Sequence, residues 1–290
     1  MRQVALSAGE IEYDETGSGP PVVLLHGLLM DHTLWDRVLP LLPEGFRYVR
    51  PVLPLGAHRL PMRPDADLGM AGMGRLLAEF LEELDLREVT LVHTDWGGGL
   101  FLTALGLHER LARQVILPCE AFDNFPPGLP GRMVVLASRV PGGLALAARQ
   151  LRVRALRDSP LMLGPMTKRR LPDALVRGWT EPLLRDAGVR RDLAAYCTAP
   201  LDKARLIRDT EALRDFTGET LVLWAPENRL MPLAHGKRLA ALLPAGRYAE
   251  IPDAGVLAML DQPEAVAQEL AAFLTGAGAD DSAGSPRTEG

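Results

Sequence analysis

Short apolar runs alternate with longer segments of helical spacing along most of the chain. The runs are nearly continuous in apolar residues, as in strands buried on both faces of a parallel sheet. They lie at 22–25, 46–53, 89–92, 114–118, 220–224 and 247–251. Apolar residues three or four positions apart predict amphipathic helices between them. These helices are expected at 31–42, 66–85, 233–243 and 262–274. The alternation predicts an α/β fold with a mostly parallel central sheet flanked by helices.

The pattern differs at the start and in the middle of the chain. Residues 3–14 alternate loosely before a turn at 17–20, which predicts an opening antiparallel hairpin. After a Pro/Gly-rich linker at 123–132, every periodic stretch is helical, and the clearest are 132–156, 172–187 and 200–214. We therefore predict a helical cap at 126–216, inserted into a core made of 1–125 and 217–275. Residues 276–290 have almost no apolar side chains to bury and are expected to be disordered.

Composition narrows the range of functions. The 290 residues include 47% hydrophobic residues, enough for a sizeable core, and the net charge of −5 argues against a nucleic-acid or anionic-membrane partner. Two distant cysteines and the lack of a long apolar segment predict a cytoplasmic protein. The histidines and cysteines have no paired metal-ligand spacing, and the glycines at 97–99 lack a phosphate-loop ending. We expect a small-molecule substrate, no metal or cofactor, and a monomer or homodimer.

The stretch 91–99, Leu-Val-His-Thr-Asp-Trp-Gly-Gly-Gly, joins a buried strand to an apolar helix. A side chain on such a sharp turn projects from the top of the sheet, near the positive end of the helix dipole. Asp95 therefore is a candidate nucleophile or base. The alternative is that Asp95 simply caps the helix that follows.

The order of several landmarks resembles the α/β-hydrolase fold family over residues 3–275. These landmarks are His26-Gly27, Asp95-Trp96-Gly97, the helical stretch, Leu223-Trp224-Ala225 and Ile251-Pro252-Asp253-Ala254-Gly255. The Asp-Trp-Gly turn is similar to the branch of haloalkane dehalogenases and epoxide hydrolases, whose nucleophile is an aspartate. The resemblance implies that Asp95 attacks carbon to form an alkyl ester, which water activated by a histidine then hydrolyses. It also implies an oxyanion site made by the backbone N–H groups of Leu28 and Trp96, in a loop shaped by His26.

The chain departs from this family pattern at the residues that should hydrolyse the ester. Val256 stands where the family places the histidine, and valine cannot accept a proton. Asn228 stands where the orienting acid usually lies. Some dehalogenases instead use an acid after the preceding strand, and Glu120 occupies that position. The sequence therefore retains a nucleophile and an acid but lacks the usual base.

Two other histidines are candidates for the missing base. His58 lies in a loop after the carboxyl end of a strand, where this fold builds its site. His93 precedes Asp95 by two residues, so on a strand its side chain points to the same side. The alternative for His93 is a buried structural histidine.

Three functions remain open on these residues. The first is an α/β-hydrolase-fold enzyme that acts on a small, largely apolar molecule with Asp95 as nucleophile or general base. Glu120, Asn228 and His58 or His93 would supply its other polar groups, and the pKa values of Asp95 and Glu120 would be pushed apart if both faced one pocket. The second is a lyase, isomerase or cyclase on the same fold. The third is a catalytically inactive protein that binds a ligand.

Overall fold

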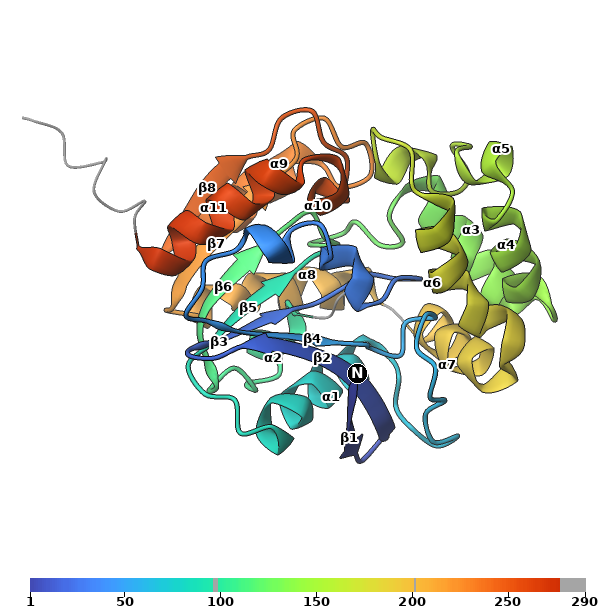
Figure 1. Ribbon diagram of the computed structural model, residues 1–290, viewed down its shortest axis with the longest axis horizontal. Coiled ribbons are helices and arrows are strands. Elements are labelled where there is room, and N and C mark those ends of the chain that lie inside the picture. The colour runs from blue at the N-terminus through green and yellow to red at the C-terminus, as the bar shows by residue number, and fades with distance from the viewer. Residues whose placement is uncertain (96–98, 201, 277–290) are drawn as a thin grey trace, which may run out of the picture.

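The computed structural model describes residues 1–95, 99–200 and 202–276. Eight strands form one sheet in the order β1-β2-β4-β3-β5-β6-β7-β8 (Figure 1). The strands are β1 (Arg2–Leu6), β2 (Gly9–Gly17), β3 (Pro21–Leu24), β4 (Arg47–Pro51), β5 (Val89–His93), β6 (Leu111–Ile116), β7 (Glu219–Trp224) and β8 (Gly246–Glu250). Strand β2 runs antiparallel to both β1 and β4, whereas all other pairings are parallel. The predicted α/β fold with a mostly parallel sheet is confirmed.

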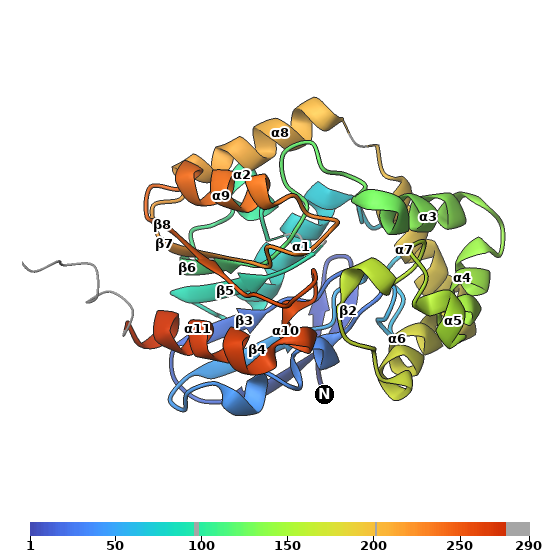
Figure 2. The ribbon, with the colours of Figure 1, turned by 90° about the horizontal axis from the view of Figure 1, so that it is seen from above.

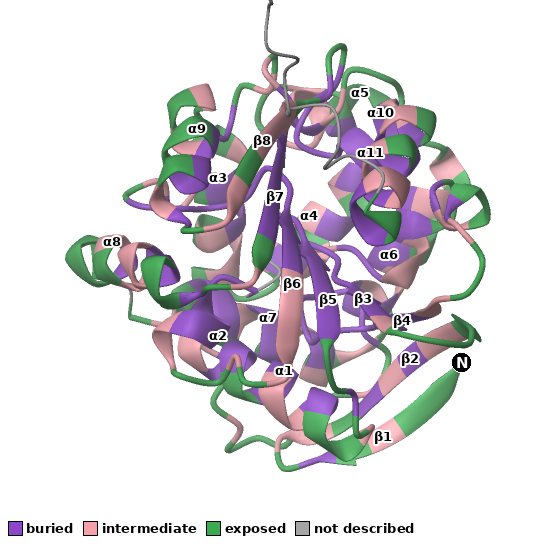
Figure 3. Cartoon of the chain, turned by 90° about the vertical axis from the view of Figure 1, so that its left-hand side faces the viewer, coloured by how far each residue is buried: buried purple, intermediate pink, exposed green. Residues whose placement is uncertain are grey.

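The central strands separate two hydrophobic cores. Successive side chains of a strand point to opposite faces. In β3, Val22 and Leu24 join one cluster and Val23 joins the other. In β5, Val92 joins the first cluster and Leu91 joins the second. Figure 3 shows that these central strands are buried along their length, whereas the edge strand β1 is largely exposed. Burial on both faces explains why these strands read as continuous apolar runs.

Helices cover both faces of the sheet. On one face lie α1, α2, α8 and α9, and on the other lie two 3₁₀ helices with α10 and α11 (Figure 2). Their bounds are η1 (His32–Trp35), η2 (Leu39–Leu41), α1 (Met70–Glu83), α2 (Phe101–Ala104), α8 (Lys203–Glu211), α9 (Leu233–Leu242), α10 (Ala258–Asp261) and α11 (Pro263–Thr275). None of the helices within the described ranges combines the length and the apolar character needed to cross a membrane.

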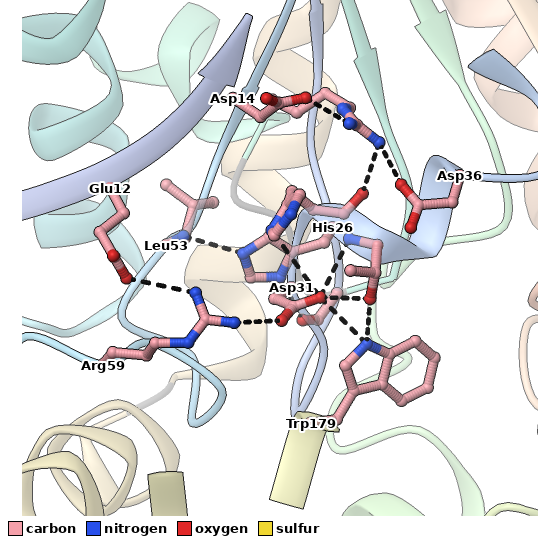
Figure 4. A network of polar contacts seen from close by, with 12 residues as sticks. Glu12, Asp14, His26, Asp31, Asp36, Leu53, Arg59 and Trp179 are labelled. Atoms are coloured by element: carbon pink, nitrogen blue, oxygen red, sulfur yellow. Dashed lines mark hydrogen bonds and ion pairs between the residues drawn. The ribbon is translucent and has the colours of Figure 1, made fainter. Parts of the chain in front are cut away.

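Five further helices between β6 and β7 form a separate group, which we name the helical insertion (Figures 1 and 2). They are α3 (Gly128–Arg139), α4 (Gly143–Leu151), α5 (Arg154–Arg157), α6 (Asp173–Arg185) and α7 (Ala187–Thr198). Polar contacts join α6 and α7 to η1 and to the loop after β4. Trp179 of α6 donates its indole N–H to Thr33 Oγ1 at 2.9 Å and lies 3.2 Å from Asp31 Oδ1 (Figure 4). Asp192 of α7 contacts His58 Nε2 at 3.2 Å and accepts from Met62 N at 2.7 Å.

Several predicted elements are wrong in detail. The single helix expected at 132–156 is three helices, because the chain turns at Gly142, whose φ is +74°. The helix expected at 31–42 is reduced to η1 and η2, since Pro40 lacks the N–H that an α-helix needs. The opening hairpin turns at residues 7–8, and residues 18–20 instead connect β2 to β3. Helix α7 was not predicted, because its apolar periodicity is weak.

Candidate functional site

Asp95 lies at a strained turn just beyond the carboxyl end of β5. Its φ of +47° is in the left-handed region, which residues other than glycine rarely adopt. Its backbone N–H donates to Pro118 O at 2.9 Å, beyond the end of β6, and its side chain is buried. Helix α2 begins at Phe101 and has Leu100 at its N-cap. The turn directs Asp95 to the edge of the sheet where parallel strands end.

The backbone N–H of Leu28 donates to Asp95 Oδ2 at 2.9 Å. The predicted oxyanion donor therefore holds one oxygen of the aspartate itself. Gly27 permits this approach, because a Cβ there would lie 2.6 Å from the Cβ of Asp95. A buried N–H bond to a carboxylate favours its ionised form and fixes its orientation.

We expect Gly27→Ala to lower the free energy of unfolding by about 1–3 kcal/mol, the usual cost of overpacking a filled site. The added methyl group would overlap the carboxyl group of Asp95 and push it away from Leu28 N. Urea unfolding measures the change. Gly178→Ala is the matched control, since a Cβ there meets nothing within 4 Å in α6, and alanine in a helix should stabilise by about 0.5–1 kcal/mol. Equal stability of the two variants would contradict the expectation.

Asp95 opens onto a cavity of about 50 Å³ between the sheet and the helical insertion. The rest of its described wall is apolar and comes from four regions of the chain: the loop after β3, the segment around α3, the segment of Leu163 and Met166, and the loop that carries Leu230. An apolar wall strengthens electrostatic interactions inside the cavity, because little water screens them. This site offers an oriented carboxylate to a small apolar group.

Glu120 lies just beyond β6 and is almost fully buried, and its Oε2 has no hydrogen-bond partner among the described residues. Burial, followed by the negative charge of Asp95, raises the pKa of Glu120 well above its ordinary value. Burial therefore favours the neutral acid form of Glu120, which lies close enough to Asp95 to feel its charge. It does not form part of the described wall of the Asp95 cavity.

The groups around Glu120 are also neutral. Burial raises the pKa of the Cys119 thiol, and the nearby carboxyl groups of Glu120 and Asp95 raise it further. Burial and the same two carboxyl groups, together with Cys197, raise the pKa of Tyr196 in α7. The surroundings therefore disfavour any additional negative charge near Asp95.

Two of the predicted histidines are buried and neutral. His26 Nδ1 lies 2.8 Å from Gly27 O, and its Nε2 accepts from Leu53 N at 2.8 Å (Figure 4). Burial lowers the pKa of His26 to about 4, and it lowers the pKa of His93 to about 3. The His93 ring packs closely on Gly99, where a Cβ would come within 2.6 Å of the ring. His26 thus shapes the loop that carries Leu28, and His93 supports the chain near the turn.

The other predicted site residues have structural contacts of their own. His58 accepts from Gly56 N at 3.3 Å and contacts Asp192, away from the Asp95 cavity. Asn228 donates to Ala225 O at 2.6 Å and accepts from Met231 N at 2.7 Å, which shapes the loop that carries Leu230. Trp96 lies outside the described residues.

Val256 is fully buried in a loop packed against the helical insertion. The next residue, Leu257, donates its N–H to Met166 O at 2.9 Å, and Met166 belongs to the wall of the Asp95 cavity. The position where the resemblance implies a histidine thus holds a buried aliphatic side chain, next to a residue that is hydrogen-bonded to that wall. The wall residues contributed by the insertion were not predicted, because no local pattern marks residues that meet only in the folded chain.

Comparison with known proteins agrees with this architecture. A family model described as the alpha/beta hydrolase family matches residues 22–269. A haloalkane dehalogenase of Mesorhizobium japonicum is 31% identical over 48% of this chain, and the match spans only 47%, about half, of that protein. Haloalkane dehalogenase 2 of Mycobacterium tuberculosis is 26% identical over 91% of each chain. A thermophilic esterase of Thermogutta terrifontis shares the fold, with a TM-score of 0.71 and 24% identity over 95% of this chain and 99% of the esterase chain.

These matches confirm the resemblance to the haloalkane dehalogenase-like branch that the Asp-Trp-Gly turn predicts. The family model covers most of the chain, including the segments that hold Leu28, Asp95, Glu120 and Val256. The chain belongs to the alpha/beta hydrolase family.

Proposed function

We propose that this protein is an enzyme in which the carboxylate of Asp95 attacks a carbon atom of a small, largely apolar molecule. The observation that supports this most directly is the position of the Asp95 carboxyl group. One of its oxygens is held by Leu28 N–H, and the group opens onto an apolar cavity at the carboxyl end of the sheet. Two relatives of this chain are named haloalkane dehalogenases, and this supports the same chemistry.

The proposed step is a displacement at carbon. An electron pair of the Asp95 carboxylate forms a new C–O bond as the bond from carbon to the leaving group breaks. The leaving group takes that electron pair and departs as an anion, and the product is an alkyl ester of Asp95. Substrate and carboxylate are held together in a cavity of low polarity, where the anion is poorly solvated and positioning replaces a bimolecular encounter.

Hydrolysis of that ester needs a base, and the described wall of the cavity contains none besides Asp95 itself. Burial raises the pKa of Glu120, which favours its protonated form, and Val256 is aliphatic. We therefore propose that the ester forms readily and is hydrolysed slowly. The same shortage of a base favours a second candidate function, in which Asp95 acts as the general base of a lyase, isomerase or cyclase.

Intact-mass spectrometry tests the proposal. The full chain is incubated with a panel of small haloalkanes, epoxides and activated esters, and Asp95→Ala serves as the control. We expect a mass gain of one substrate-derived group per chain that maps to Asp95 and is absent from the variant. With haloalkanes, about one halide ion should be released per chain.

Two other outcomes have different meanings. Release of many product molecules per chain without an adduct would overturn slow hydrolysis and show that another residue supplies the base. Absence of both adduct and product across the panel would contradict covalent chemistry at Asp95. The lyase-type and binding functions would then be the ones to pursue.

A further inference from the structure

The helical insertion carries an apolar groove of about 300 Å³ between α3 and α4. Large apolar side chains stand unusually exposed along it. Leu136 and Leu146 are each 55% exposed, Val140 is 51% exposed and Leu161 is 46% exposed. Gln150 is the single polar side chain in its described wall, which contains no titratable group. Exposed apolar surface gathered in one groove marks a place that binds something apolar.

This groove adjoins the Asp95 cavity. Leu29, Pro130, Val134 and Leu163 line both spaces. Val134 and Pro130 lie on α3, so this helix belongs to the walls of both spaces. A molecule bound in the groove would therefore lie next to the cavity that holds Asp95.

The size of the cavity explains why a substrate would need the groove. A single water molecule requires roughly 10–15 Å³ of such space, so the cavity of about 50 Å³ accommodates only a few atoms. Ligand sites of proteins usually measure roughly 300–1,000 Å³, which is the size of the groove. The reacting carbon fits at Asp95, and the rest of the molecule must extend along α3 and α4.

We propose that the groove binds the uncharged hydrocarbon tail of an elongated substrate whose reacting carbon lies at Asp95. The proposal rests on the proposed function of Asp95 and names its substrate class. A charged tail is excluded, because the wall offers no group to pair with it. Met133 and Met162 lie in the wall, and their flexible thioethers adapt to tails of different shape.

Binding of unreactive straight-chain alcohols tests the groove independently of Asp95 chemistry. The dissociation constants of 1-butanol, 1-hexanol and 1-octanol are measured by calorimetry on the full chain and on Asp95→Ala. Each buried methylene should tighten binding about three- to fourfold. The dependence on chain length should be the same in both proteins, so a failure of the nucleophile would leave this result intact.

Matched substitutions locate the tail. Leu136→Glu and Leu146→Glu place a charge in the groove and should weaken octanol binding at least tenfold, with little change for butanol. Leu129→Glu is the control: Leu129 lies on α3 like Leu136, is similarly exposed at 52%, and does not line the groove. Circular dichroism checks that each variant is folded. Two groove variants are made so that the test still works if one of them fails to fold.

Several results would overturn the proposal. Affinity that does not rise with chain length would exclude a tail site, and so would equal loss of octanol binding in Leu129→Glu. If the groove variants leave octanol binding unchanged but alter the sedimenting mass or the binding to neutral phosphatidylcholine vesicles, the groove instead binds a second copy or a lipid surface. A stable adduct at Asp95 combined with any of these results would refute the groove and leave the proposed function standing.

Discussion

The Val256→His variant is expected to hydrolyse the alkyl ester of Asp95 about 10²–10⁴ times faster than the natural protein, which is the usual contribution of a positioned general base. Val256 occupies the position where the resemblance to Asp-nucleophile hydrolases implies a histidine. The same resemblance implies that an acid at the position of Glu120 orients the histidine in some dehalogenases, and Glu120 Oε2 has no partner in the described structure. The imidazole would then accept a proton from water as the water attacks the ester carbonyl.

The measurement is a single turnover. A haloalkane first loads Asp95, excess substrate is removed, and loss of the adduct mass is followed with time. Val256→Gln is the control for a polar side chain of similar size that cannot accept the proton. The double variant Val256→His/Glu120→Gln tests whether Glu120 orients the new base, and it should lose most of the gain. An adduct that persists in a folded Val256→His protein would contradict the assignment of this position.

Acid is expected to destabilise the protein by several kcal/mol between pH 6.5 and about 3, because His26 and His93 are buried without charge. Their pKa values in the folded protein are about 4 and about 3, below the ordinary 6.5. In this range the unfolded chain binds more protons than the folded chain, so stability falls as the pH falls. Each unit of pKa difference corresponds to about 1.4 kcal/mol.

Glu120 opposes this trend over part of the range. Its pKa is raised in the folded protein, so above about pH 4.5 the folded chain binds the extra proton and stability falls as the pH rises. Between pH 4.5 and 6.5 the two histidines affect the free energy of unfolding more than the one carboxyl group does. The free energy of unfolding therefore still rises with pH. Asp14 and Asp192, whose pKa values are lowered, affect stability only below that window.

Urea unfolding at pH 4.5, 5.5 and 6.5 measures these slopes. His93→Gln should flatten the dependence on pH, and Glu120→Gln should steepen it. His108→Gln, in the loop after α2, is the control for loss of a histidine away from the Asp95 turn. A steep dependence that survives unchanged in His93→Gln would show that His93 does not carry this effect.

The sequence predicts the sheet and the residues at its carboxyl edge because both follow from local patterns. Continuous apolar runs identify β3, β5, β6 and β7, and the glycine-rich turn after β5 identifies Asp95. Leu28 N–H is expected at this edge as an oxyanion donor, and in the structure it donates to Asp95 itself. The resemblance to the family, not a local pattern, identifies Glu120 just beyond the end of β6.

What the sequence does not predict depends on contacts between distant segments. The loop position of His58 predicts a role in the site, but its ring contacts Asp192, 134 residues away. Asn228 stands where the family's orienting acid is expected, but its side-chain amide bonds to Ala225 O and Met231 N within its own loop. The cavity wall joins residues of α3, Leu163 and Leu230, whose meeting no periodicity encodes.

The polar contacts of Trp179 and Asp192 anchor only part of the helical insertion. They anchor α6 and α7 to the core, whereas no side-chain hydrogen bond within the described part of the chain joins α3 or α4 to the sheet. Apolar packing, which holds α3 and α4, has no directional preference and tolerates sliding. Ligand exchange therefore requires only that α3 and α4 yield locally, while α6 and α7 stay anchored to the core.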